Sequence, residues 1–202
     1  CAKEEDQGGI ERRMQYLKDL RKNKPNLLLV DTGDHFKEPT RQGKLKALTL
    51  MKATQKMGYD AVALGERDLV YGSRFLQDQS IPFIAGNIEL EDLPLKKSQT
   101  KEFNNGLKVA ILSIVDPSLF YLKNHAGLKV PNPDQILSQE ISRIQESSSV
   151  DLIVLLTHMH REKALKYMID ENSSLLEKSH EQDHSNFTYL NSWSNHYKSW
   201  KY

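Results

Sequence analysis

Short apolar segments alternate with amphipathic segments along most of this chain. Apolar side chains at steps of three and four residues predict amphipathic helices, and this pattern covers residues 9–23, 44–57, 74–79, 135–146 and 161–170. Continuous apolar runs are typical of buried strands, and they cover residues 26–30, 61–64, 82–88, 107–115 and 151–156. Strands followed by helices in this rhythm predict a layered α/β fold with a mostly parallel sheet.

Two segments depart from that rhythm. Residues 90–105 are polar, and we expect a loop that closes on a hairpin turn at Asn104, Asn105 and Gly106. Residues 173–202 are rich in Ser, His, Asn, Lys and aromatic residues and show no sustained period. We therefore predict one folded domain over residues 1–172 and an irregular, potentially disordered tail over residues 173–202.

Composition and charge exclude few classes of function. The chain has 202 residues, of which 38% are hydrophobic and 27% charged, as is ordinary for one globular domain. A formal net charge of +1 gives no support for nucleic acid or an anionic membrane as a partner. No apolar run is long enough to predict a transmembrane segment.

Cys1, the only cysteine, leaves two interpretations open. It is either the acylated first residue of a processed lipoprotein or the start of a shortened sequence, and we favour the second. A single cysteine cannot form an intramolecular disulfide, so the redox compartment is not fixed by counting.

Polar and ionisable residues gather directly after the predicted strands. In open α/β sheets, ligands bind at the carboxyl ends of the strands. Carboxylates suit hard divalent cations, and imidazoles suit borderline ones. The sequence therefore predicts a metal or ligand site built from residues that follow the strands, among them Asp31, Asp34, Glu66, Arg67, Asp68, Asn87, Asp116, His158 and His160.

An ordered set of segments resembles the 5′-nucleotidase branch of the calcineurin-like metallophosphoesterases. GGIERR at residues 8–13, DTGD at 31–34, MGYDAVALG at 57–65, AGNI at 85–88 and the segment 150–158 match the family's successive motifs in order. The resemblance implies a layered α/β/β/α-type fold and a hydrolase of nucleotides or other phosphomonoesters that uses two divalent ions, such as Mn, Zn or Fe. It also implies a role in nucleotide catabolism and a periplasmic or cell-envelope location.

The same resemblance assigns roles to individual residues. Asp34, Glu66 and His158 are the implied metal ligands, with His160 a weaker candidate than His158. Arg67 and Asp68 are the implied catalytic residues, and Asn87 is implied to bind substrate.

Plainer interpretations compete with these roles. Asp34 also suits a turn, His158 a helix cap, Glu66 with Arg67 a solvated ion pair, and Asn87 a strand-end amide that bonds to backbone. We expect Asp31 to be structural and His35 to face solvent.

The chain also departs from the family pattern. Gly65-Glu66-Arg67-Asp68 stands where the family has Gly-Asn-His-Glu, and Val70 replaces a later acidic residue. Arg67 can bind a phosphoryl oxygen but cannot donate a proton at neutral pH. The family's D-x-H and G-H-x-H motifs are not recognisable, so we interpret the fold as incomplete at both ends.

We accordingly expect weak or no turnover from this chain. A rival hypothesis is a non-catalytic phosphoesterase-like domain that binds a ligand or a partner in an envelope assembly. A third is a damaged gene product that does not fold stably, because a missing central strand would expose a sheet edge.

Overall fold

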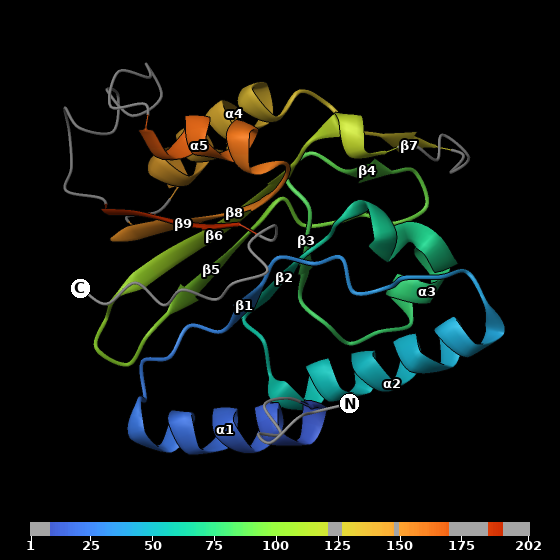
Figure 1. Ribbon diagram of the computed structural model, residues 1–202. Coiled ribbons are helices and arrows are strands. Elements are labelled where there is room, and N and C mark those ends of the chain that lie inside the picture. The colour runs from blue at the N-terminus through green and yellow to red at the C-terminus, as the bar shows by residue number, and fades with distance from the viewer. Residues whose placement is uncertain (1–8, 121–126, 148–149, 170–185, 192–202) are drawn as a thin grey trace.

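A computed structural model describes residues 9–120, 127–147, 150–169 and 186–191 of the chain. Its strands form two main sheets (Figure 1). The first sheet is parallel, in the order β1-β2-β3, with β1 at Val30–Asp31, β2 at Ala61–Ala63 and β3 at Phe83–Ile84. The second has the order β5-β6-β8-β9, with β5 at Ser98–Glu102, β6 at Lys108–Val115, β8 at Leu152–His158 and β9 at Asn186–Asn191. A small antiparallel pair joins β4 (Glu89–Leu90) to β7 (Leu128–Lys129).

Helices cover both outer sides of this pair of sheets. Figure 1 shows α1 (Ile10–Asn23) and α2 (Arg41–Met57) below the sheets, with α4 (Pro133–Ser147) and α5 (Arg161–Ile169) above. Shorter helical segments follow the strands: η1 (Glu66–Tyr71), α3 (Ser73–Gln77) and η2 (Pro117–Leu119). The described chain is therefore a layered α/β/β/α fold, as the resemblance implied.

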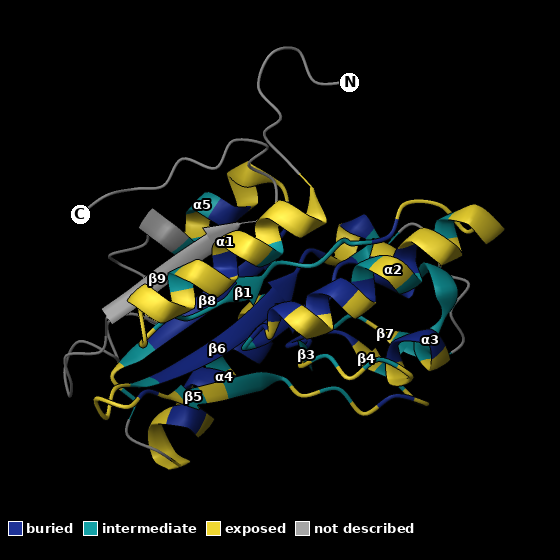
Figure 2. Ribbon diagram, turned by 90° about the horizontal axis from the view of Figure 1, so that it is seen from below, coloured by how far each residue is buried: buried dark blue, intermediate teal, exposed yellow. Residues whose placement is uncertain are grey.

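Alternate side chains of β6 point to opposite faces of its sheet, and this explains why the sheet has packing partners on both sides. Val109 and Ile111 pack with Ala63 and Ile84 of the first sheet, in the space between the two sheets. Their neighbours on the opposite face, which include Leu112, pack against α4 and α5. Successive residues of a strand point to opposite faces, so a strand that is apolar throughout can be buried on both. Figure 2 shows β6 in the buried colour, whereas α1 keeps an exposed outer surface.

Local chemistry fixes the ends of α2. The Thr40 side chain accepts a hydrogen bond from the Gly43 backbone N–H at 3.0 Å and so caps the first turn. Gly58 ends the helix in the left-handed conformation, with φ of 63°. The helix then packs Ala53 and Met57 against Val62 of β2, which brings β2 directly above it.

The structure confirms the predicted helices and hairpin and corrects two predictions. Residues 98–102, expected to be loop, form β5, which pairs antiparallel with β6 through the predicted turn. Residues 186–191, expected to belong to an irregular tail, form β9 parallel to β8. Both strands are held by backbone pairing with a neighbour, which does not require a long apolar period. The rest of the predicted tail lies outside the described residues, so its division from the domain stays a prediction.

Within the described part of the chain, none of the helices combines the length and the apolar character needed to cross a bilayer.

Candidate metal centre

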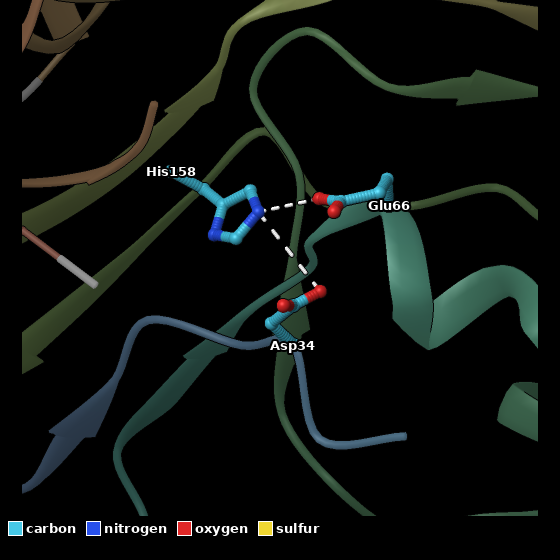
Figure 3. A group of neighbouring side chains, drawn as sticks. All are labelled: Asp34, Glu66 and His158. Atoms are coloured by element: carbon cyan, nitrogen blue, oxygen red, sulfur yellow. Dashed lines mark hydrogen bonds and ion pairs between the residues drawn. The ribbon is translucent and has the colours of Figure 1, made fainter. Parts of the chain in front are cut away.

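Three side chains from separate segments converge at the carboxyl end of the strands (Figure 3). Asp34 lies in the loop after β1, Glu66 is the first residue of η1 after β2, and His158 is the last residue of β8. The strands that place them are parallel, so their carboxyl ends share one edge of the layered fold. The sequence predicted this convergence, and the structure brings all three residues together.

The geometry of the group suits a divalent cation. One candidate ligand atom from each residue lies within 4.8 Å of the others. His158 Nε2 is 2.5 Å from Glu66 Oε2 and 3.9 Å from Asp34 Oδ1 (Figure 3). His158 is buried, whereas Asp34 and Glu66 are partly exposed, so the group opens on the carboxylate side. Two carboxylates and one imidazole form a donor set that accepts Mn, Fe or Zn.

Two carboxylates and one imidazole lie close together in this group, and their charges shift one another's pKa values. Burial raises the pKa of Asp34, and the negative charge of Glu66 raises it further. Burial opposes charge on Glu66 and His158 as well, but their mutual hydrogen bond and attraction outweigh it. The pKa of Glu66 is therefore lowered and that of His158 raised. A cation between the two carboxylates would relieve the repulsion that disfavours ionised Asp34.

The backbone at Asp34 adopts a conformation that is rare for residues other than glycine, and such conformations cluster at functional sites. Gly33 has φ of 84° and Asp34 has φ of 68°, a region that residues other than glycine rarely adopt. A Cβ atom on Gly33 would collide with the Ala63 carbonyl. A Cβ atom on Gly65 would lie 3.1 Å from Asp34 Oδ1 and 3.2 Å from His158 Nε2, at the centre of the group. Both glycines therefore allow the ligand-bearing loops to approach closely.

Asp68 is buried and bonds to the backbone of both loops that supply the carboxylates. Its side chain has no exposed surface. Its carboxylate accepts hydrogen bonds from the backbone N–H groups of Asp34, His35 and Gly65, at 2.7, 2.8 and 2.8 Å. The catalytic role of Asp68 stays a prediction, and the side chain that would carry it is buried and bonded to backbone groups.

His35 was expected to face solvent, and the structure shows the opposite. Its side chain is 8% exposed and lies between two carboxylates. Nδ1 is 3.1 Å from Asp68 Oδ1, and Nε2 makes a 3.4 Å ion contact with Asp31 Oδ1 rather than a well-aligned hydrogen bond. Burial lowers the pKa of His35, but the two carboxylates outweigh it and raise the pKa to about 10. The spacing of Asp31 and His35, four residues apart, was the only local signal of this contact.

Asp31 has the structural role that the sequence predicted. Its Oδ1 accepts the Gly33 N–H at 3.1 Å, and its Oδ2 lies 3.5 Å from Arg13 of α1. Burial raises the pKa of Asp31, but the hydrogen bond and charge of His35, the Gly33 N–H and the charge of Arg13 together lower it below its usual value. Asp31 thus holds the turn that precedes Asp34.

Arg67 lies at the open side of the group, with a half-exposed side chain. Its backbone N–H donates to Asp34 Oδ1 at 3.1 Å. Its Nε atom lies 3.6 Å from Asp34 Oδ2 and 3.8 Å from Glu66 Oε1. The guanidinium therefore faces both candidate ligands and also reaches solvent, where an incoming anion would meet it.

Asn87 lies in the interior, and its predicted contact with substrate stays a prediction. Its side chain is fully buried, donates to the Val115 and Pro131 carbonyls at 2.9 and 3.0 Å, and accepts the Val115 N–H at 2.8 Å. All of these partners are backbone groups. Asn87 thus ties the end of the first sheet to β6, which is the plainer of the two interpretations that the sequence allowed.

Two further residues complete the comparison with the sequence. His160 is exposed and does not belong to the three-residue group. Asp116, at the end of β6, is buried and pairs with Lys163 of α5 at 2.6 Å, a contact that the sequence pattern did not reveal.

Comparisons with known proteins agree with this architecture. No protein-family model matches the chain. The chain is 27% identical over 167 residues to a 5′-nucleotidase from Diplobatis ommata, a stretch that covers 74% of the chain and 28% of that protein. Among solved structures, it resembles a 5′-nucleotidase precursor from Thermus thermophilus with a TM-score of 0.70 at 20% identity, over 79% of this chain and 33% of that one.

A second solved structure extends the likeness. The calcineurin-like phosphoesterase YfkN from Bacillus subtilis aligns with a TM-score of 0.61 at 22% identity, over 77% of this chain and 55% of that one. At these identities the solved structures establish the fold alone. The chain spans 28% of the length of the first curated relative, so the activity of the whole protein is a matter for proposal.

Proposed function

We propose that this chain, which is similar to 5′-nucleotidases and shares the fold of the calcineurin-like phosphoesterases, binds a divalent metal ion through Asp34, Glu66 and His158. We propose further that it is a metal-dependent hydrolase of nucleotides or other phosphomonoesters. The observation that supports both statements is the convergence of these three side chains at the carboxyl edge of the sheets.

The donor set fits one ion directly. Two carboxylates and one imidazole provide three ligand atoms, and the family implies divalent metal binding. The resemblance implies a pair of ions, but the described residues contain no second group of three such side chains. When bound, a divalent ion supplies a Lewis acid for a phosphoryl oxygen and lowers the pKa of a coordinated water.

Arg67 is the residue of this site that can meet the substrate phosphate. Its guanidinium is half-exposed and lies beside both carboxylate ligands. A guanidinium binds phosphoryl oxygens through paired N–H donors. A guanidinium contributes charge and orientation to such a contact rather than a proton. Weak or no turnover therefore stays our prediction for this chain.

The names of the relatives support a nucleotide as the substrate, since several are described as 5′-nucleotidases. Participation in nucleotide catabolism and a periplasmic or cell-envelope location follow from the same likeness, and both are part of the proposal. Fractionation of cells that express the natural full-length protein would test the location.

A metal titration tests the proposal most directly. We expect the chain to bind Mn²⁺ in calorimetry and to hydrolyse AMP or p-nitrophenyl phosphate only when Mn²⁺ is present. Asp34→Asn and His158→Ala should each weaken Mn²⁺ binding by about 100-fold or more, because the first removes the negative charge of one ligand and the second removes an imidazole ligand. His160→Ala, an exposed histidine close in sequence, is the matched control and should bind as the parent does.

The proposal fails if the unaltered chain binds none of Mn²⁺, Zn²⁺ and Fe²⁺. It also fails if Asp34→Asn and His158→Ala bind these ions as tightly as the parent does.

A further inference from the structure

Asp68 lies beneath the candidate metal centre and bonds to both loops that supply its carboxylates. Its Oδ2 atom accepts hydrogen bonds from the Asp34 N–H at 2.7 Å and the Gly65 N–H at 2.8 Å. Gly65 directly precedes the ligand Glu66. A single buried carboxylate therefore joins the loop after β1 to the loop after β2.

β-Pairing alone does not hold these loops together. The pairing of β1 with β2 ends at Asp31 and Val62, before either ligand is reached. Beyond it, Asp34 has a positive φ that regular strand pairing does not maintain. The Arg67 N–H also links the loops by donating to Asp34 Oδ1, but this bond occupies an oxygen of the ligand itself. Asp68 leaves the ligand oxygens of Asp34 and Glu66 free.

His35 supports Asp68 from the side. The His35 N–H donates to Asp68 Oδ1 at 2.8 Å, and its ring Nδ1 lies 3.1 Å from the same oxygen. The far side of the ring faces Asp31. A carboxylate with no exposed surface is costly unless it is hydrogen-bonded and paired. His35 meets both needs from the position next to Asp34.

We propose that Asp68 is a positioning residue, which holds Asp34 and Glu66 at the separation a metal ion requires, with His35 as its buried partner. This inference rests on the proposed metal site. Asp68 acts through backbone groups and touches neither ion nor substrate. Groups that orient metal ligands from behind change metal affinity by roughly 10- to 100-fold when they are removed.

The test compares Asp68→Asn with a matched control, Asp60→Asn, in the full chain. Asp60 also accepts a backbone N–H, from Leu29 at 2.8 Å, and also pairs with a cation, Lys101 at 2.7 Å. It precedes β2, at the end of that strand opposite to Gly65 and Glu66. The two substitutions therefore remove the same charge, one directly before β2 and the other in η1, which follows β2.

Calorimetric titration with Mn²⁺ is the measurement, and circular dichroism establishes that each variant is folded. In Asp68→Asn, an amide nitrogen replaces one of two oxygens that each face N–H donors, so the loops should lose their fixed spacing. We expect its Kd for Mn²⁺ to rise by about tenfold or more. Asp60→Asn should lower the melting temperature but leave the Kd within about twofold of the parent value.

A folded Asp68→Asn chain with the Kd of the parent would overturn the positioning role. So would equal weakening in both variants, because loss of stability would then explain it. If Asp68→Asn does not fold, His35→Gln takes its place, since it removes the ring and keeps the backbone donor. That variant should bind Mn²⁺ more weakly than Asp60→Asn does, and an unchanged Kd would overturn the inference.

The two proposals fail in different ways. An unaltered chain that binds no Mn²⁺ contradicts the metal site and the positioning role together. Normal binding by the parent with no effect of Asp68→Asn contradicts the positioning role alone.

Discussion

At the scale of single residues, charges of opposite sign alternate from the mouth of the candidate centre to its base. Arg67 lies at the mouth, beside the carboxylates of Asp34 and Glu66. The buried pair of Asp68 and His35 lies beneath them. Each carboxylate therefore has a cationic or N–H partner, which keeps the buried charges from destabilising the fold. A metal ion would add positive charge at the point where the carboxylates of Asp34 and Glu66 repel each other.

Asn87 offers a prediction about stability rather than binding. Asn87→Ala removes three hydrogen bonds to buried backbone groups, so the free energy of unfolding should fall by roughly 3 kcal/mol. Urea unfolding measures the loss. The folded fraction should still bind Mn²⁺ and inorganic phosphate as the parent does. Weaker phosphate binding without any loss of stability would instead support the substrate-binding role.

Asp116 gives a prediction about pH. Burial raises the pKa of Asp116, but its hydrogen bonds and charge pair with Lys163 and its bonds with Ser118 lower it below the usual value. A carboxyl with a lowered folded pKa stabilises the protein above its unfolded pKa of about 3.9, and that contribution is lost as the pH falls through the folded value.

Asp116→Asn should therefore cost about 1.5 kcal/mol at pH 7, and the difference from the parent should shrink below about pH 4. Urea unfolding at pH 7 and pH 3 checks this. Lys163→Met should show the same trend, since it removes the other half of the pair. A difference that is equal at both pH values would contradict the assignment.

At the scale of elements, the site depends on strand register. β6 pairs with β8 so that Val115 lies opposite His158, at the carboxyl end of both strands. β1 and β2 are parallel, so the residues that follow them, from Thr32 and from Leu64 onward, leave the sheet at the same edge. A shift of one residue would move every side chain of a strand to the opposite face. The buried pattern on both faces of β6 therefore fixes the position of His158 as well as the core.

Lys101 of β5 links the two sheets and yields a prediction at this scale. Its Nζ donates to the Leu27 carbonyl at 2.8 Å and to Asp60 at 2.7 Å. Lys101→Met should destabilise the fold by about 1 to 3 kcal/mol, because both acceptors lose a charged donor. Lys97→Met is the matched control, since Lys97 makes a 3.8 Å surface pair with Glu89, and its loss should cost below about 0.5 kcal/mol. Equal urea midpoints for the two variants would show that Lys101 does not join the sheets.

At the scale of the whole molecule, the proposed ion would join both sheets. Glu66 and His158 lie 92 residues apart in sequence. Glu66 follows β2 of the first sheet, whereas His158 ends β8 of the second. An ion that binds only the folded chain stabilises it by mass action, by about 2.7 kcal/mol at a concentration 100 times the Kd.

Mn²⁺ should accordingly raise the melting temperature by about 5 °C or more at that concentration, and EDTA should reverse the rise. Thermal unfolding followed by circular dichroism measures the shift. Asp34→Asn is the control and should show no rise. A rise of equal size in Asp34→Asn would mean that Mn²⁺ stabilises the chain from another site.

The sequence determined the layered fold class, the order of its principal helices and strands, and the convergence of Asp34, Glu66 and His158. The fold class and the element order follow from the spacing of apolar residues along the chain. The convergence follows because parallel strands bring the residues after them to one edge. Only the tertiary structure decided which polar residues face that edge. Asp68, His35 and Asn87 are ordinary loop residues in the sequence, but long-range backbone partners bury them. Strand β9 likewise depends on pairing with β8, a partner that no local pattern could name.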